Sequence, residues 1–437
     1  MKKSNIKLFH NKDFLLLFLG GFVSRIGNGI HYIALIWFVL EITGSGSATG
    51  LVLLLSTLPG VIFGPFSGVI ADKFDRKKLI VSMDILRGFI VLWLGYTIYM
   101  GVANFFHISL ATILIAICTS LFNPALTASI PNIVDDSLLQ KANSLNHFSI
   151  NFTQIIGAGV GGVLIGVYGI SGVFFINGIS FLISAFSELF INLPEIKIEK
   201  EMKKSPTILN EIKFGLDFLW GKKEIVALFT IAIFLNFLFT GLMMLGIPYI
   251  FKEILAVNSR SYGFAQSVFP AGAVVGSIIL SQIPEIRNYY KVLLYSLNIQ
   301  SLLLLVLGLP FIPYFLINTT TMKIYYLIML VLFIIGIFNA VINVPIGILL
   351  QRLIPDNLRG RITGLLSTMT QALVPISLAL TGYLLDILPI YTLFIGGGVL
   401  ALALTLYITK VPDMHKLDYS KQNTSEQINL STSTLDA

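Results

Sequence analysis

Three polar side chains interrupt the first long apolar block of the sequence, residues 14–41. Arg25, Asn28 and His31 lie within about 120° of one another around a helix and near its middle. An ionisable side chain at that depth in a membrane is costly unless it is paired or hydrated, so each is a candidate for function. Arg25 can bind an anionic or polar group of a substrate, neutralise an acid, or hydrogen-bond carbonyl groups purely for packing. His31 can carry a proton, because histidine changes its charge near neutral pH.

Uncharged amides within later apolar blocks form a second set of candidates. Beside abundant Phe and Met, their hydrogen-bonding groups suit a large amphipathic ligand in an apolar cavity. Amides also bridge neighbouring helices, and we expect about half of these to do so. The candidates for the cavity wall are Asn123, Gln154, Asn236, Asn339 and Gln371.

Acidic residues within the blocks predict a different kind of contact. Asp84 and Arg87 are three residues apart, a helical spacing that predicts a buried ion pair, with a proton relay as the alternative. Glu188 is expected near the inner surface, within reach of water. Glu41 and Asp386 fall at the outer ends of their blocks, where we expect them to be solvated.

A compact group of glycine, acidic and basic residues follows the second block, in the stretch GPFSGVIADKFDRKK of residues 64–78. Its glycines favour the close approach of two helices, and its charges predict a tight turn. An aspartate such as Asp72 is stabilised where it meets the positive N-terminal end of a helix. Asp135 or Asp136, after the fourth block, is expected to pair with Arg76.

The elements that must position these residues are helices in a membrane. Hydrophobic residues make up 55% of the 437 residues and charged residues only 12%, whereas a soluble domain carries roughly 25% charged residues. Long continuous apolar blocks predict helices, because a barrel would show short alternating segments. The sequence therefore predicts an all-α membrane protein. Its twelve transmembrane helices are expected near 14–41, 46–71, 78–101, 107–134, 142–169, 172–193, 225–251, 261–283, 289–317, 323–350, 362–386 and 390–410.

The distribution of Lys and Arg predicts the orientation of these helices. With the N-terminus inside, 24 of the 29 fall in inner segments and only Lys252, Arg260 and Lys323 fall in outer loops. The positive-inside rule then places both termini in the cytoplasm of a multi-pass protein of the cell membrane. The basic charge reflects this topology and an anionic inner leaflet, so no nucleic-acid partner is predicted.

The longest polar stretch before the tail divides the chain into two sets of six helices. The predicted domains are an N-terminal bundle, 1–193, and a C-terminal bundle, 225–411, followed by a disordered tail, 412–437. The linker, 194–224, is expected to hold an amphipathic helix at the inner surface or a solvated one. Short matches recur between the halves, such as Phe122-Asn123 with Phe338-Asn339, which supports a duplication with a substrate site between the bundles.

A glycine-rich stretch lies in the fifth block, IGAGVGG at residues 156–162. No strand precedes it, so we exclude a nucleotide site. The spacing of Gly157 and Gly161, and of Gly162 and Gly166, favours close helix packing.

These motifs together resemble the major facilitator superfamily. The 64–78 loop is similar to its G-x-x-x-D-x-x-x-R-[KR] loop, and the glycine stretch is similar to its antiporter motif, with Ala158 where the family has proline. The resemblance implies that Gly68, Asp72 and Arg76 form a conformational latch that packs against a helix of the other half. It also implies that the helix with Arg25 lines a central cavity. The same loop and PDNLRGR at 355–361 resemble the macrolide-efflux branch in particular.

The predicted function is secondary active export of amphipathic small molecules, such as macrolide-like drugs, by alternating access coupled to proton entry. Export of a siderophore, lipid or other metabolite is an alternative, and a transport-inactive sensor or scaffold is another. No ATP-binding loop, metal spacing or Ser/His/Asp arrangement is found, so no enzyme activity, cofactor or metal is predicted. The expected partners are the small-molecule substrate, the proton and the lipid bilayer, with the chain acting as a monomer.

Overall fold

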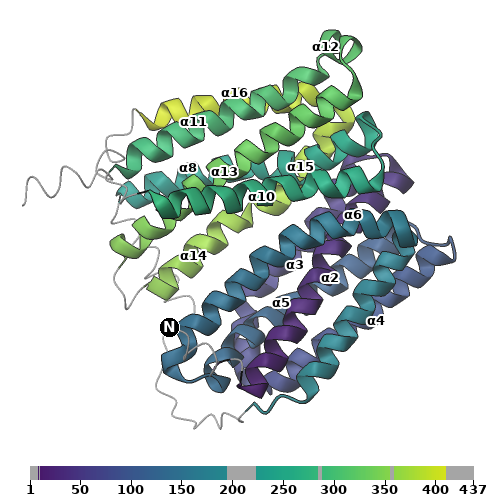
Figure 1. The fold of residues 1–437 in the computed structure, drawn as a ribbon, viewed down its shortest axis with the longest axis vertical. Coiled ribbons are helices and arrows are strands. Elements are labelled where there is room, and N and C mark those ends of the chain that lie inside the picture. Colours follow the sequence, from purple (N-terminus) through teal and green to yellow (C-terminus); the bar gives the residue numbers. More distant parts are fainter. Residues whose placement is uncertain (1–7, 9, 194–222, 284–287, 355–358, 410–437) are drawn as a thin grey trace, which may run out of the picture. The chain divides into compact units, whose positions relative to one another are not determined.

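The chain folds into long helices joined by short turns, as a computed structural model of all 437 residues shows (Figure 1). The structure describes residues 8, 10–193, 223–283, 288–354 and 359–409, and within them it contains helices and no strand. The first half comprises α2 (Lys12–Thr43), α3 (Gly46–Lys73), α4 (Arg76–Tyr99), α5 (Phe105–Ile133) and α6 (Asp136–Leu189). The second half comprises α8 (Lys223–Gly241), η1 (Leu242–Gly246), α9 (Ile247–Tyr249), η2 (Ile250–Ile254), α10 (Ser259–Gln282), α11 (Tyr289–Gly308), η3 (Leu309–Phe311), α12 (Pro313–Asn318), α13 (Thr321–Leu353), α14 (Arg359–Ala372), α15 (Val374–Ile387) and α16 (Ile390–Ile408).

Eleven helical segments of the described residues are long and apolar enough to cross a membrane. The difference from twelve arises in α6, which contains both the fifth and the sixth expected block. Gly157 and Asn177 of α6 both contact α2, at Gly29 and Gly27 respectively. A straight helix would hold these two α6 residues about 30 Å apart, so the chain must turn back between them. It does so at Gly169, whose φ of 70° is left-handed backbone that favours glycine. Helix α6 therefore crosses the membrane twice.

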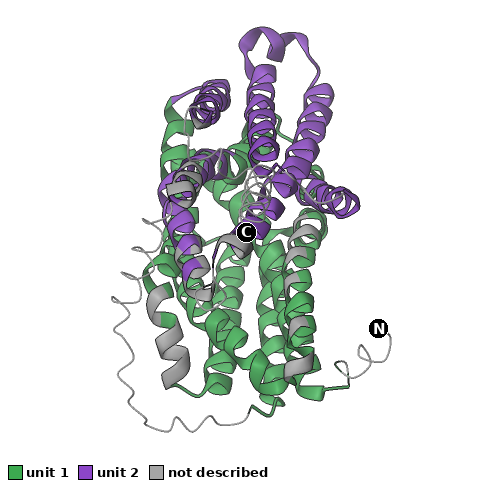
Figure 2. Cartoon of the chain, turned by 90° about the vertical axis from the view of Figure 1, so that its left-hand side faces the viewer, with its two compact units in different colours: residues 1–201, 243–267, 378–387 green, residues 202–242, 268–377, 388–437 purple. Residues whose placement is uncertain are grey.

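The packing of the chain defines two compact units, coloured separately in Figure 2. Unit 1 comprises residues 1–201, 243–267 and 378–387, and unit 2 comprises residues 202–242, 268–377 and 388–437. Two segments from the second half of the sequence thus pack with the first. The predicted linker, 194–224, and the tail, 412–437, lie almost entirely outside the described residues, so those domain boundaries stay a prediction.

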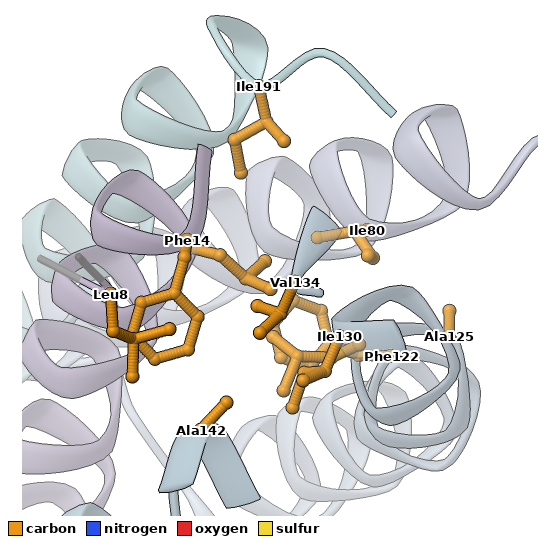
Figure 3. Close-up of a cluster of buried hydrophobic side chains, with 11 residues drawn as sticks. Leu8, Phe14, Ile80, Phe122, Ala125, Ile130, Val134, Ala142 and Ile191 are labelled. Atoms are coloured by element: carbon orange, nitrogen blue, oxygen red, sulfur yellow. The ribbon is translucent and has the colours of Figure 1, made fainter. Parts of the chain in front are cut away.

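A cluster of apolar side chains closes one end of unit 1, where α2 begins (Figure 3). Phe14 of α2, Ile80 of α4 and Phe122 of α5 are all buried in it. Asn11 fixes the start of α2, because its side chain accepts a hydrogen bond from the Phe14 amide and donates one to the carbonyl of Ile133. This cap ties the N-terminus of α2 to the C-terminus of α5 and so sets the position of the polar face that follows.

Glycines set the closest helix contacts in unit 1. A Cβ added at Gly157 would lie 2.7 Å from the Cα of Gly29, and one at Gly162 would lie 2.5 Å from the Cα of Gly263. The glycine-rich stretch therefore packs α6 against α2 on one side and against α10 on the other, as its spacing predicts. The expectation was wrong at Gly64, because nothing described lies within 4 Å of a Cβ there.

Candidate functional site

Arg25 lies in the middle of α2 and is partly buried. Its guanidinium donates hydrogen bonds to the Ser149 hydroxyl, at 2.9 Å, and to the Asn146 side-chain oxygen, at 2.7 Å. Both partners belong to the first part of α6 and both are neutral. Within the described residues no carboxylate forms an ion pair with Arg25. The side chain therefore brings an uncompensated positive charge to mid-depth in unit 1.

The other two residues predicted on this face of α2 differ in their surroundings. Asn28 is half-buried. His31 is buried, and its ring meets that of Phe174 of α6 edge-on, with 4.9 Å between the centroids. Its Nδ1 atom has no hydrogen-bond partner among the described residues. The structure thus holds His31 inside the packing of α2 on α6, a place that sequence periodicity alone does not reveal.

The predicted amides divide between the two units. In unit 1, Asn123 is exposed on α5, whereas the side chain of Gln154 lies outside the described residues. In unit 2, Asn236 of α8 accepts a hydrogen bond from Thr240 and donates one, at 3.4 Å, to the carbonyl of Thr370 in α14, so this amide does bridge two helices.

The two remaining amides of unit 2 have different surroundings. Asn339 of α13 accepts hydrogen bonds from Asn343, one turn further along the same helix. Gln371 of α14 is exposed. An exposed amide at membrane depth is costly against lipid and favourable against water, so Asn123 and Gln371 are the amides best suited to a hydrated surface.

The turn between α3 and α4 is built by its own charges. Asp75 caps α4 by accepting a hydrogen bond from the Lys78 amide at 3.1 Å. Arg76 donates to the carbonyl of Ala128 in α5, at 2.8 Å. Asp135, one of the two predicted partners of Arg76, is exposed at the start of α6. The environments of Gly68, Asp72 and Asp136 lie outside the described residues, so the latch stays a prediction.

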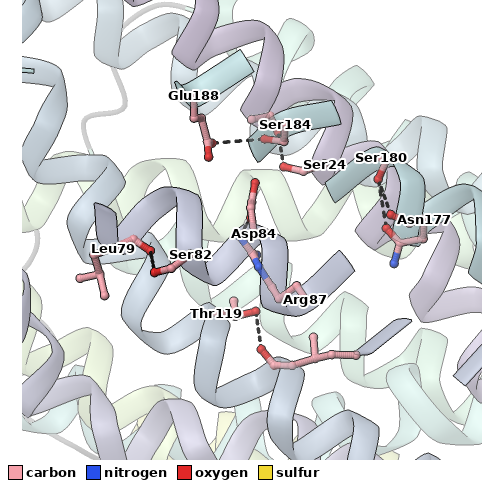
Figure 4. Close-up of polar contacts among 12 residues, drawn as sticks. Ser24, Leu79, Ser82, Asp84, Arg87, Thr119, Asn177, Ser180, Ser184 and Glu188 are labelled. Atoms are coloured by element: carbon pink, nitrogen blue, oxygen red, sulfur yellow. Dashed lines mark hydrogen bonds and ion pairs between the residues drawn. The ribbon is translucent and has the colours of Figure 1, made fainter. Parts of the chain in front are cut away.

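A buried polar cluster lies between α4 and α6 (Figure 4). Arg87 and Asp84 of α4 form an ion pair, and both are almost completely inaccessible to solvent. Glu188 of α6 was expected to reach water, but it is only 1% exposed. The hydroxyl of Ser184 donates a hydrogen bond of 3.2 Å to Glu188.

Glu41 and Asp386 are exposed, as expected, but sequence reasoning missed that both also form polar contacts within unit 1. Asp386, at the end of α15, accepts hydrogen bonds from the amides of Gly46 and Ser47, at 2.6 and 2.9 Å, and from the Ser45 hydroxyl, at 2.8 Å. These groups form the first turn of α3, whose positive end favours an anion.

An ion pair accompanies the hydrogen bonds of Asp386. Glu41 of α2 pairs with Lys252 of η2 at 3.2 Å, and the Lys252 ammonium lies 4.1 Å from the centre of the Trp37 ring. We call these bonds of Asp386 and Lys252 the outer contact, because they lie on the side that the distribution of Lys and Arg predicts to be outside. Its partners are more than 200 residues apart, so no local signal in the sequence could pair them.

Long apolar helices in two units, with isolated polar side chains at membrane depth, define the class as a multi-pass membrane protein. The comparison with known families is more specific. Residues 3–434 match the family described as "Transmembrane secretion effector". The chain belongs to this family of the major facilitator superfamily, whose members are transporters and not enzymes.

Related proteins match along nearly their whole length. YfiS, an MFS-type transporter of Bacillus subtilis (strain 168), is 25% identical, with 96% of this chain and 99% of YfiS covered. Macrolide efflux protein A of Streptococcus pyogenes is 22% identical, with 95% and 99% covered. The Staphyloferrin A transporter of Staphylococcus aureus (strain NCTC 8325 / PS 47) is also 22% identical, with 95% and 98% covered.

Solved structures share the fold at lower identity. A bacterial homologue of the iron transporter ferroportin, in an inward-facing state, has a TM-score of 0.69 at 14% identity, with 92% of this chain and 98% of that chain covered. A D-xylose–proton symporter has a TM-score of 0.63 at 15% identity, with 90% and 96% covered. The all-α major facilitator fold predicted from the sequence is therefore confirmed.

Proposed function

We propose that the protein is a secondary active exporter of amphipathic small molecules, working by alternating access and coupled to proton entry. The observation that carries the proposal is Arg25. The Arg25 guanidinium lies at mid-depth and has only neutral hydrogen-bond partners, so a negatively charged or strongly polar group of a bound ligand can pair with it. In the same unit, the exposed amide Asn123 adds a hydrogen-bonding group to the otherwise apolar α5, which suits a ligand with both apolar and polar parts.

The outer contact supports the alternating-access part of the proposal. It joins segments from the two halves of the sequence through the hydrogen bonds of Asp386 and one ion pair, beside the glycine contacts of α3 with α15. Exposed ion pairs are worth about 0–1 kcal/mol, and a helix cap about 1 kcal/mol. Bonds of this strength can form and break in every transport cycle.

Two classes of cargo follow from the relatives and from Arg25. Macrolide-like drugs are suggested by the macrolide efflux relative. A siderophore or another anionic metabolite is suggested by the staphyloferrin relative, and the uncompensated charge of Arg25 favours this second class. The two classes differ in the sign of the charge that would lie next to Arg25 of α2.

Accumulation in whole cells tests the export proposal. Cells that express the chain should accumulate less erythromycin, or less of a labelled anionic siderophore, than cells with an empty vector. A charge reversal, Arg25→Glu, should abolish export of the anionic cargo and spare export of the cationic one. Equal accumulation of every cargo with the chain and with the empty vector would leave a sensor or scaffold as the better account.

A further inference from the structure

The polar cluster between α4 and α6 contains one more acid than base. Asp84, Arg87 and Glu188 are each at most 1% exposed, so bulk water cannot solvate their charges. If both carboxylates were ionised, the cluster would carry one uncompensated negative charge in an apolar interior. One added proton makes it neutral.

The hydrogen bonds of the cluster leave room for that proton. Oδ1 of Asp84 accepts from Arg87, and Oε1 of Glu188 accepts from Ser184. The other oxygen of each carboxyl, Oδ2 of Asp84 and Oε2 of Glu188, is buried without a partner among the described residues. Ser184 lies beside both carboxyls, and the charge of Asp84 acts on Glu188 (Figure 4). Two neighbouring carboxyls beside one hydroxyl, each with one buried and unpartnered oxygen, are an arrangement that a proton satisfies.

No other charge in the described surroundings compensates the cluster. Arg87 is already enclosed between the rings of Phe122 and Phe181, 4.0 and 4.6 Å from its guanidinium carbon, so it is held in place. Helix α5 contributes the thiol of Cys118, and its one histidine, His107, contacts Trp93 instead.

Helix α2, which also packs on this part of α6, meets Ser184 at Gly20. Of the two acidic residues of α2, Asp13 accepts from the amide of Asn192 and Glu41 pairs with Lys252, while Arg25 is bonded to the first part of α6. The remaining charges of α4 are Arg76, which bonds α5, and two lysines on the exposed first turn. The imbalance of charge is therefore local to Asp84, Arg87 and Glu188.

We propose that Asp84, Arg87 and Glu188 form a buried proton-binding site, in which one proton is shared between the two carboxyls and exchanged during transport. The binding of the proton stands on the cluster alone, whereas its exchange during transport rests on the proposed export function. Glu188 is the penultimate residue of α6 and directly precedes the exposed Leu189 and Phe190, so its carboxyl lies close to the surface at the end of that helix. The proton then has a short route in and out.

Infrared spectroscopy of the purified chain tests the binding of the proton. At neutral pH the wild type should show the carbonyl band of a protonated carboxylic acid. Glu188→Gln and Asp84→Asn should each abolish the band, because each leaves one carboxylate for one guanidinium. Arg87→Gln should increase it about twofold, because two carboxyls then lack a cation. The control Glu253→Gln, which removes an exposed carboxylate, should leave it unchanged.

A band that persists unchanged in Glu188→Gln would overturn the proposal. If that variant fails to fold, Asp84→Asn decides the question alone, since it removes the same excess acid. Circular dichroism shows which variants are folded.

Transport in vesicles tests the exchange of the proton. With erythromycin as probe, Glu188→Gln should keep substrate exchange across the membrane, while its accumulation under an imposed pH gradient falls to the level without a gradient. If Glu188→Gln responded to the pH gradient as the wild type does, the proposed exchange of the proton would be wrong. A wild type that moves no probe would refute the export function, and the infrared result would still decide whether the site binds a proton.

Discussion

Arg25 and Arg87 show how differently one residue type is used within a single unit. Arg87 is paired with Asp84 and packed between two aromatic rings, so its charge is compensated by the protein. Arg25 has two neutral hydrogen-bond partners, so its charge remains available to a ligand. The first arrangement stabilises a fold or holds a proton, and the second recruits a negative or strongly polar group.

Substitutions at Arg25 should therefore separate cargo by charge. Arg25→Gln removes a charge-assisted hydrogen bond worth about 1.5–3 kcal/mol, which is roughly a ten- to hundredfold loss of affinity for an anionic cargo. Arg25→Lys should lose less, because the charge remains. Initial rates in vesicles measure both effects, with Lys323→Gln, in the exposed first turn of α13, as the control. Equal losses for anionic and cationic probes would instead assign Arg25 to the packing of α2 on α6.

At the scale of elements, glycine decides where helices meet. α6 contacts α2 at Gly157 and α10 at Gly162, and α3 meets α15 through Gly46, Gly50 and Gly382. At each of these positions an added Cβ would fall within 3.0 Å of a backbone or side-chain atom of the facing helix. In a membrane, where apolar side chains gain little by leaving lipid, such close backbone contact is a main source of helix association.

Gly157→Ala should therefore destabilise the chain. The new methyl group would meet the backbone of α2, and overpacking of this kind costs about 1–3 kcal/mol. We expect a lower midpoint of thermal unfolding in detergent. Gly60→Ala is the matched control, since it adds the same methyl group to a helix where nothing described lies within 4 Å. If the two variants unfold alike, the contact at Gly157 does not limit stability.

The outer contact leads to a second prediction about how helices meet. Asp386→Ala removes the cap of α3, at a cost of about 1 kcal/mol, which changes a conformational equilibrium roughly fivefold. The change should favour states in which the first turn of α3 is free.

In a chain lacking Cys118, a cysteine at the buried position Thr49 should then react faster with a membrane-impermeant thiol reagent. Asp13→Ala, which removes an acid from the opposite end of α2, is the control. An unchanged rate of labelling would show that Asp386 does not hold this contact closed.

At the scale of the whole molecule, apolar surface and charge together fit a membrane. Large apolar side chains such as Phe89 of α4, Phe186 of α6 and Tyr407 of α16 are exposed in the chain alone, where lipid can cover them. The basic residues gather in the segments predicted to be inside, and this distribution is the basis of the predicted orientation.

Cysteine labelling in whole cells tests that orientation. In a chain with Cys118→Ala, Val102→Cys should react with an impermeant maleimide added outside, because Val102 is exposed in a predicted outer loop. Phe74→Cys, exposed in a predicted inner loop, should react only after the cells are permeabilised. The reverse pattern would place both termini outside and would also invert the assignment of the outer contact.

The sequence by itself determined the class of protein, the apolar helices and the major facilitator family. These features follow from composition, from blocks of about 20 apolar residues and from local motifs. Each of these depends only on residues that are close along the chain. It also predicted the Asp84–Arg87 pair and the packing glycines of the fifth block, because both have helical spacing.

Tertiary structure alone decided which distant groups meet. Asp386 reaches the start of α3, Glu188 is buried beside Asp84, and Arg25 finds Asn146 and Ser149. Each pairing joins residues about 100 or more apart, so no periodicity along one helix encodes it. Helical spacing shows which side chains share a face, whereas the rotation and depth of each helix against its neighbours fix what that face touches.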